Sequence, residues 1–355
     1  MKVFLGRCNS YRKVKPVIKE GIDSLGGIKN FVKEGETLLV KPNLLRGDSP
    51  EKAINTHPDF IIAVVKILEE AGVNVIVGDS PGGPMKETIL KRMYQKAGWD
   101  RIEEETGAKL NYDTSMYPID FPPGNVIKSI DALGIIQDVD GVINLPKLKT
   151  HMFTVYTGAV KNMFGCVHGL TKSGYHGQYR GLDKFSKMLR DVNDAVNPRL
   201  SIMDGIYGMQ GQGPGSGGEL IKTNMVLASS DSTSLDAAAC LSVGIPIKKV
   251  KTIKDLEEIA YTNLTPDDID IQINYPEGGS NPWYMPNFLT GFISNFFLKR
   301  PTLDKQKCIK CGKCHEICPN DAITMKDYGP TISWWKCIRC YCCAEVCPVD
   351  ALRKG

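Results

Sequence analysis

The cysteine residues of this sequence are concentrated near its C-terminal end. Of the twelve cysteines in the 355-residue chain, nine lie between Cys308 and Cys347. They form two copies of the pattern C-x2-C-x2-C-x3-C-P, at 308–319 and 337–348, with a constant offset of 29 residues. Three thiolates from one tight loop can bind three irons of a cubane cluster, and the fourth iron then needs a thiolate from elsewhere. The spacing therefore predicts metal ligands rather than a disulfide framework.

Both segments resemble the bacterial two-cluster ferredoxins, in which the fourth cysteine of each run binds the other cluster. The resemblance implies two [4Fe–4S] clusters and low-potential, one-electron transfer. It also implies a redox partner protein or another low-potential electron donor. The implied ligand sets are Cys308, Cys311, Cys314 and Cys347 for one cluster, and Cys337, Cys340, Cys343 and Cys318 for the other.

A zinc site is the alternative interpretation of the cysteine cluster. Zinc needs four ligands, usually supplied as two separated C-x2-C pairs. Two triplets with two remote cysteines fit that arrangement poorly. Cys342 is left over, either as a bystander beside Cys343 or as an exchanged ligand.

The rest of the chain alternates between expected strands and helices. Apolar runs predict strands at 36–41, 73–77, 140–145, 200–203 and 224–228. Helical spacing predicts helices at 57–72, with Thr56 as its N-cap and Gly72 as its stop, from about 84 to 98, and at 232–243. This order predicts an α/β body with a mostly parallel sheet, followed by a small α+β ferredoxin-like domain. We expect an α/β domain at 1–279, an aromatic-rich connecting segment at 280–300 and the two-cluster domain at 301–355.

In parallel sheets, ligands bind at the loops that follow the carboxyl ends of the strands. One such loop begins at Lys41 and includes Asn43. The glycine-rich loop 78–83 is interpreted either as an anion cradle or as a plain tight turn. The segment 203–218 contains seven glycines, and it predicts a flexible lid, a backbone surface fitted to a ligand, or disorder.

The segment 146–176 contains four lysines and three histidines but no acidic residue. Such a cluster is costly unless it is solvated or offset by an anion. We interpret it as an anion site in preference to a solvated basic face. The expected catalytic residues are Lys149, His151 and Lys161, and the expected substrate-binding residues are Lys41, Asn43, Lys147 and His176. Cys166 and His168 are candidates for a mononuclear metal site, against the alternative of a buried thiol and a loop histidine.

Several strings in the body occur in a recognisable order: VKPNL, GDSPGG, INLPKLKTH, TGAVKNMFG and MDGIYGMQGQGPGSGG. Together they resemble the uncharacterised proteins catalogued as domain of unknown function 362, over roughly residues 2–244. That resemblance implies a cytoplasmic iron–sulfur protein of unsettled substrate. A fainter similarity links His151, Lys161 and His176 to nickel-pincer lactate racemases, which use a lysine-anchored cofactor and histidines in a comparable loop.

Charge and hydropathy narrow the possible partners. The formal net charge of +4 argues against a nucleic-acid binder that depends on bulk electrostatics. The N-terminus lacks the apolar run of a signal peptide, and no apolar stretch is long enough to cross a bilayer. We therefore expect a cytoplasmic location and no membrane association. The aromatic-rich segment 280–300 is expected to pack the two-cluster domain against the body or to form a homodimer contact, with a membrane-surface role as the alternative.

Three functions remain open from the sequence. The first is a relay of electrons through two clusters to an anionic small molecule bound in the body. The second is a pure electron carrier whose body docks partner enzymes. The third is a non-redox metal- or ligand-dependent enzyme in which the clusters have a structural or sensing role. The presence of two clusters favours the first two functions, because two clusters can form an electron relay, whereas a purely structural role would need only one.

Overall fold

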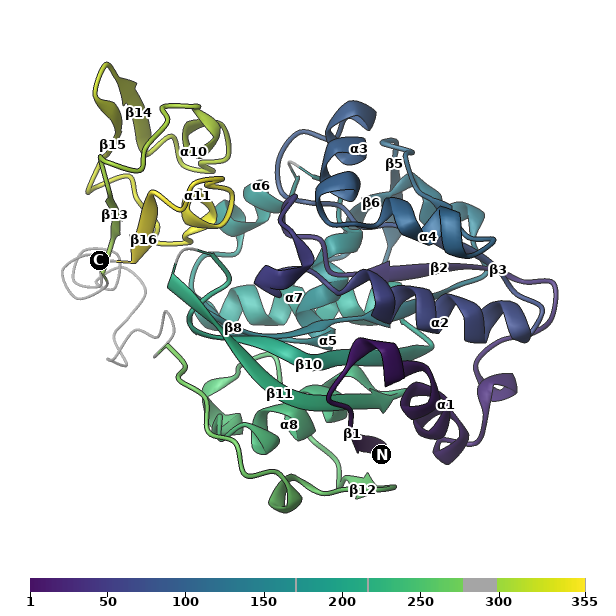
Figure 1. The fold of residues 1–355 in the computed structure, drawn as a ribbon. Helices are drawn as coiled ribbons and strands as arrows, with labels where there is room; N and C mark the ends of the chain where they lie inside the picture. The colour runs from purple at the N-terminus through teal and green to yellow at the C-terminus, as the bar shows by residue number, and fades with distance from the viewer. Residues whose placement is uncertain (170, 216, 277–298, 355) are drawn as a thin grey trace.

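A ten-stranded, mostly parallel sheet forms the centre of the body, and the cysteine-rich module lies beside it (Figure 1). The structure is a computed structural model that describes residues 1–169, 171–215, 217–276 and 299–354. In sheet order the main path contains β12 (Ala260–Tyr261), β1 (Lys2–Arg7), β11 (Gly217–Ser229), β10 (Leu200–Gln212), β7 (Gly141–Leu145), β2 (Thr37–Pro42), β3 (Asn74–Val77) and β4 (Lys109–Leu110). Off this path, β8 (Lys147–His151) pairs with β10 and with β9 (Val155–Thr157). The predicted α/β class is confirmed.

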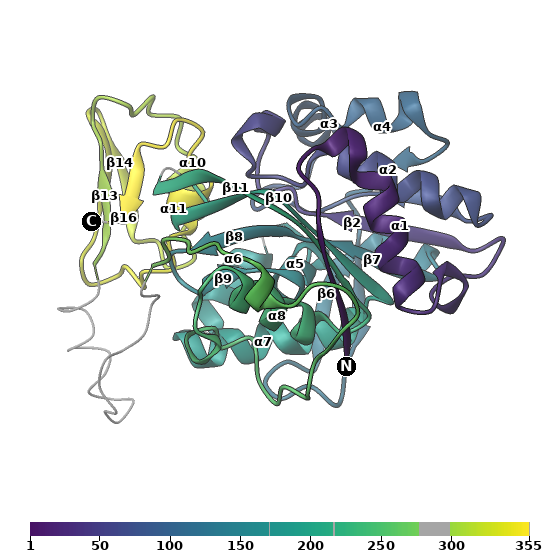
Figure 2. The same ribbon diagram turned by 60° about the horizontal axis from the view of Figure 1, so that its bottom comes forward.

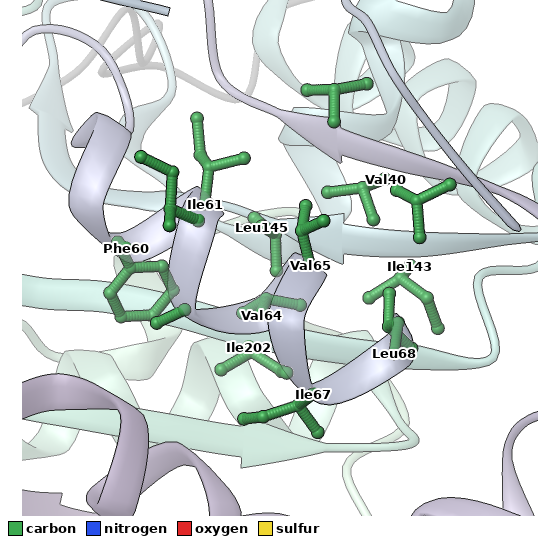
Figure 3. Packing of buried hydrophobic residues seen from close by; sticks show 14 of the residues in the cluster. Val40, Phe60, Ile61, Val64, Val65, Ile67, Leu68, Ile143, Leu145 and Ile202 are labelled. Carbon is green, nitrogen blue, oxygen red and sulfur yellow. The ribbon is translucent and has the colours of Figure 1, made fainter. Parts of the chain in front are cut away.

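Both faces of the sheet are buried, which explains the near-continuous apolar runs of its strands. Alternate residues of one strand point to opposite faces, so Val40 and Leu39 belong to different clusters of the core. Figure 3 shows Val40 and Ile143 on the face covered by helix α2 (Pro58–Glu70), where they pack against Val64, Val65 and Leu68.

Helices cover the two faces in separate layers (Figure 2). Helices α1 (Val14–Ser24) and α2 share a core cluster with one face. Helices α7 (Leu182–Val196) and α8 (Ser232–Ser242) pack against the other face, α7 beside β2 and β7, and α8 beside β1 and β11. The short helices α3 (Glu87–Lys96) and α4 (Asp100–Glu105) follow β3, and a separate hairpin is formed by β5 (Met116–Asp120) and β6 (Ser129–Leu133).

The predicted N-cap of α2 is wrong by one residue. His57 is the N-cap, and its Nδ1 accepts a hydrogen bond of 3.2 Å from the backbone N–H of Asp59. Thr56 instead donates its hydroxyl hydrogen to the carbonyl oxygen of Leu145, at 2.8 Å. This hydrogen bond joins the segment before α2 to strand β7.

The glycine-rich segment 203–218 is mostly strand, so the predictions of a lid and of disorder are wrong for its described residues. It forms the end of β10 and the start of β11, which pair from Met203–Leu227 to Gln212–Gly217. Gly208 shows why glycine occurs in this strand: a side-chain Cβ there would collide with Leu148 of β8. Glycine therefore allows two strands to approach closely.

The basic segment 146–176 is folded into the core. It supplies β8, β9, α5 (Ala159–Asn162) and α6 (Thr171–Gln178). All five residues of β8 are buried, including Lys147, Lys149 and His151. The alternative of a solvated basic face is therefore wrong for β8.

The C-terminal module contains two copies of one local structure. It contains β13 (Pro301–Leu303) paired with β16 (Leu352–Lys354), β14 (Ile323–Lys326) paired with β15 (Gly329–Ile332), and the one-turn helices α10 (Lys313–Glu316) and α11 (Cys342–Glu345). The repeat extends to the backbone: positive φ angles occur at 310 and 339, at 312 and 341, and at 321 and 350. Each pair is separated by the 29 residues of the sequence repeat. Most of the expected connecting segment 280–300 lies outside the described residues.

Candidate functional site

A cavity of about 100 Å³ lies where the sheet meets the cysteine-rich module, and we call it the inner cavity. Its walls come from the end of β2 and the loop after it, from the loop after β3, from the segment that runs from α5 to α6, and from the module at Ile317 and α11. Among its lining residues are Lys41, Asn43, Asp79, Lys161, Lys172, His176, Cys342 and Glu345. Loops after parallel strands and a separate module thus form one site.

Lys41 is neutralised within the wall of this cavity. Its Nζ lies 2.8 Å from Oδ1 of Asp79 and also donates to Oδ1 of Asn162, at 3.1 Å. Asp79 accepts further hydrogen bonds from the backbone N–H groups of Leu44 and Ser80. A Cβ at Gly165 would collide with both charged groups, so glycine is required there. The loop 78–83 therefore supplies a carboxylate to the cavity wall at Asp79.

Two other lysines at the cavity lack an acidic partner at ion-pair distance among the described residues. Lys161 makes no hydrogen bond to another described residue. Burial lowers its pKa, while the nearby Glu345 carboxylate opposes that change. Lys172 donates to the carbonyl oxygen of Ser80, and burial lowers its pKa to about 7. At neutral pH, Lys172 can therefore hold or release a proton.

His151 and His176 are neutral imidazoles near the same carboxylate. Burial lowers the pKa of His151 to about 4 and that of His176 to about 3. Nε2 of His151 lies 3.0 Å from Oε1 of Glu345, but neither atom makes a well-aligned hydrogen bond within the described part of the chain. Nδ1 of His176 is also buried without a partner there. Three buried polar atoms near the cavity therefore lack a well-aligned hydrogen bond within the described part of the chain.

The remaining predicted residues of β8 lie behind the cavity or away from it. Lys149 donates to Oδ1 of Asn43 and to the carbonyl oxygen of Ile54, so it positions a lining residue. Lys147 pairs with Asp204 of β10 at 2.7 Å and donates to the hydroxyl of Tyr11 at 3.0 Å. Lys147 does not line the inner cavity, and its pair with Asp204 indicates a structural role.

Cysteines from both copies of the repeated pattern lie close together in the module. Four of them, Cys308, Cys311, Cys314 and Cys347, line one small cavity. In the other group, the Cys318 and Cys340 thiols both influence the pKa of Cys337. The Sγ atoms of Cys318 and Cys347 accept backbone hydrogen bonds of 3.2 Å from Ala322 and Ala351, which are again 29 residues apart.

The leftover Cys342 faces the inner cavity, and its thiol interacts with that of Cys340. No group of three His, Cys, Asp or Glu side chains in the described ranges converges on a single-ion site. Cys166 is buried in the core, and Nε2 of His168 lies 3.1 Å from the carbonyl oxygen of Thr114.

Arg46 fixes the module to the body. Its Nη1 donates to the carbonyl oxygen of Cys347 and, at 2.8 Å, to Oδ1 of Asp350, while its Nε donates to Asp48. Beside it lies an outer cavity of about 460 Å³. The outer and inner cavities share Leu45, Gly82, Ile317 and Val346 in their walls, so they adjoin.

Asp79, Arg46 and Glu345 contribute to these cavities but are not among the site residues expected from the sequence. Asp79 lies in the loop 78–83, where a strand end followed by an acidic residue was an available signal. Arg46 and Glu345 carry no such signal, because each contacts a part of the chain about 200 to 300 residues away.

Residues 38–241 match the family model described as "Domain of unknown function (DUF362)", which covers more than half of the chain. The chain belongs to the DUF362 family. The "Thylakoid-associated protein sll1697" of Synechocystis is 32% identical to this DUF362 protein over 274 residues, which are 76% of this chain and 82% of the relative. The resemblance inferred from the motifs is confirmed.

The C-terminal module of the DUF362 protein matches a second model, "4Fe-4S dicluster domain", at residues 307–351. The ketoisovalerate oxidoreductase subunit VorD of Pyrococcus horikoshii is 33% identical over 66 residues, which are 19% of this chain and 57% of that subunit. The VorD subunit of Pyrococcus abyssi is 32% identical over the same shares. These matches confirm an iron–sulfur, ferredoxin-type electron-transfer domain.

Among solved structures, the DUF362 protein is similar to the lactate racemase apoprotein of Thermoanaerobacterium thermosaccharolyticum. The identity is 15% and the TM-score 0.42, over 67% of this chain and 57% of that one. A similarity of this size carries no conclusion about mechanism. Among the described residues of the DUF362 protein, no helix is both long and apolar enough to cross a membrane.

Proposed function

We propose that this DUF362 protein relays electrons through two [4Fe–4S] clusters to an anionic small molecule bound in the inner cavity. One observation carries this proposal. Cys342 and Glu345 of the iron–sulfur module line the same cavity as Lys161 and His176 of the body. An electron-transfer module and a cationic pocket therefore share a wall.

The ligand sets in this proposal are those expected from the cysteine spacing. The first set lines one cavity, and the second is close enough for its thiols to influence one another electrostatically. When bound, the clusters supply one-electron transfer. The proposed ligands are Cys308, Cys311, Cys314 and Cys347 for one cluster and Cys337, Cys340, Cys343 and Cys318 for the other.

The two sets differ in their surroundings, and this difference supports a direction for the relay. Cys311 of the first set is exposed, so a redox partner protein can approach it. Cys340 of the second set interacts with Cys342, whose side chain lines the inner cavity. The proposed path therefore leads from the protein surface, through the first set and the second, to the cavity.

The body residues in this proposal bind an anion and manage its protons. Asp79 is already balanced by Lys41, whereas Lys161 has no acidic partner at ion-pair distance among the described residues. An anion beside Lys161 would compensate a cation that is otherwise costly to bury. Lys172, with a pKa of about 7, lines the same cavity and is the proposed donor of a proton to a reduced product.

A pure electron carrier is the second candidate, and the exposed Cys311 favours it equally. The two candidates differ in what they require of the inner cavity. A carrier needs no ligand there, so its electron transfer would not depend on Lys161.

Lys161→Ala tests the relay. The protein with its clusters is reduced anaerobically and mixed with a panel of small carboxylate and oxoanion acceptors, and cluster reoxidation is followed by absorbance. We expect at least one acceptor to reoxidise the wild type, and the variant to lose at least about 90% of that rate with an unchanged cluster spectrum. Lys91→Ala, on the exposed side of α3, is the control. Equal rates in wild type and Lys161→Ala would favour the pure carrier.

Two expectations from the sequence remain predictions alongside this proposal. A cytoplasmic location is tested by cell fractionation in the source organism. A homodimer is tested by light scattering of the intact protein, which would give about twice the mass of the 39.1 kDa chain.

A further inference from the structure

The outer cavity has the size of a small-molecule binding site. Its volume of about 460 Å³ falls within the range of 300–1,000 Å³ that is typical of ligand pockets. It lies between helix α3, the loop after β2 and the module, with α10 and the residues around Pro348 forming the module side. Four shared residues connect it to the inner cavity, so a single ligand can occupy both.

Cations dominate the wall of this cavity. Arg92 and Lys96 are exposed on α3 four residues apart, and Lys313 faces them from α10. None of the three has an ion pair with another described residue. Like charges at this helical spacing are destabilising unless an anion lies between them. Glu316 is the one acidic side chain of the wall that lacks an ion pair in the described ranges, because Asp48 is paired with Arg46 and Lys52.

Arg46 supplies a second, independent observation. Its side chain is 8% exposed, and the residue lines the cavity. Its Nε and Nη1 atoms are bound to Asp48 and to the module, but its buried Nη2 has no hydrogen-bond acceptor in the part of the chain that the structure describes. A buried guanidinium nitrogen without an acceptor is costly. A ligand anion in the cavity that Arg46 lines would supply a charged acceptor beside this side chain.

The backbone opposite these cations is unobstructed. At Gly83, no heavy atom lies within 4 Å of the position that a Cβ would occupy, and at Gly82 the nearest is 3.9 Å away, in Val346. Small residues at this point leave room for a group larger than a carboxylate. We infer that the outer cavity binds the phosphate or pyrophosphate end of an organic phosphate, with the rest of that molecule reaching into the inner cavity.

Phosphate fits these observations better than a simple carboxylate. A pyrophosphate group carries several negative charges and offers oxygens in several directions, which matches the guanidinium groups of Arg46 and Arg92 and the ammonium groups of Lys96 and Lys313. The statement that the other end of the ligand is reduced rests on the proposed function. The statement about the phosphate end rests on the outer cavity alone.

Pyrophosphate itself is the probe for the outer cavity. Calorimetric titration of the anaerobic, cluster-loaded protein should give saturable binding, and the double variant Arg92→Ala/Lys96→Ala should weaken it at least about tenfold. Arg92→Lys/Lys96→Arg keeps both charges and should retain most of the affinity. Lys91→Ala removes a neighbouring cation of α3 that is paired with Glu87, and it should bind as the wild type does. No saturation at millimolar pyrophosphate, or equal affinity in the double alanine variant, would overturn the inference.

A second comparison separates this inference from the proposed function. Lys161→Ala alters the inner cavity only, so it should bind pyrophosphate with unchanged affinity while losing acceptor reduction. If pyrophosphate fails to bind but reduction still depends on Lys161, the phosphate site is wrong and the relay stands. If pyrophosphate binds but Lys161 is dispensable for reduction, the outer site stands without the relay.

Discussion

Nε2 of His151 lies 3.0 Å from Oε1 of Glu345, and this contact joins strand β8 of the sheet to helix α11 of the iron–sulfur module. Nδ1 of His151 accepts backbone hydrogen bonds from Phe153, at 3.0 Å, and from Thr154, at 3.3 Å. The ring hydrogen must therefore be on Nε2, where it faces the carboxylate. A neutral histidine and a charged glutamate thus link the two parts of the protein beside the inner cavity.

Glu345→Ala should loosen the module from the body. It removes the carboxylate that faces the buried Nε2–H of His151 at 3.0 Å, and we expect a loss of about 0.5–1.5 kcal/mol in the free energy of unfolding. Chemical denaturation of the cluster-loaded protein measures this change, and hydrogen exchange at 342–347 locates it. Glu316→Ala is a matched control, because Glu316 occupies the equivalent position of the first repeat and is exposed. A similar loss of stability in both variants would contradict the role assigned to the contact.

Iron and acid-labile sulfide should each amount to about eight per chain, because each cluster contains four of each. Cys343→Ser should reduce the iron content by about half or more, since it removes a proposed ligand. Cys342→Ser should keep about eight irons, because Cys342 faces the inner cavity. Loss of iron in Cys342→Ser would indicate that this residue is a ligand in place of its neighbour. Metal analysis and electron paramagnetic resonance of the reduced protein make the measurement.

His176→Phe should reduce the sensitivity of the protein to acid. Burial, together with Lys161 and His151, holds the pKa of His176 at about 3 in the folded state, against 6.5 for an exposed histidine. Between these two values only the unfolded state binds the proton, so stability falls as the pH decreases from 6.5. At pH 5 this single group costs about 2 kcal/mol relative to pH 7.

A phenylalanine at this position keeps the stacking on Phe185, where the ring centroids lie 4.2 Å apart, and it cannot titrate. The difference in unfolding free energy between pH 7 and pH 5 should therefore be smaller in the variant by about that amount. Denaturant titration at both pH values, with the cluster absorbance as a check of integrity, provides the test. An unchanged difference would show that His176 does not titrate as its burial predicts.

Two lysines of the same basic segment should respond in opposite ways to replacement by methionine. Lys147→Met leaves the buried Asp204 without its 2.7 Å partner, which should cost about 3–5 kcal/mol in stability. Lys161→Met removes a cation that has no ion pair with another described residue, so stability should be unchanged or increased. Thermal unfolding of the two variants compares them directly. Substantial destabilisation by Lys161→Met would show that Lys161 has a structural partner.

Much of the fold could be predicted from local patterns. The strand at Asn74–Val77 lies close to its expected place, because burial on both faces of a sheet requires a continuous apolar run. The helix at Pro58–Glu70 does so because its buried face requires apolar residues at helical spacing. The hairpin of β10 and β11 could not be predicted in the same way. Its many glycines predict a loop, whereas in the structure Gly208 lies in a strand and allows β8 to approach closely.

The iron–sulfur repeat was determined by the sequence itself. Its ligands come from short loops, and the 29-residue offset that aligns the cysteines also aligns the backbone angles at 310 and 339. The position of the electron-transfer module relative to the basic segment was decided only by the tertiary structure. Lys147 and Lys161 look alike in the sequence, yet one pairs with Asp204 and the other faces the inner cavity with Glu345 nearby. The spacing of cysteines within a short loop shows which residues can bind a cluster. The partner of a buried charge instead depends on which distant elements fold against it.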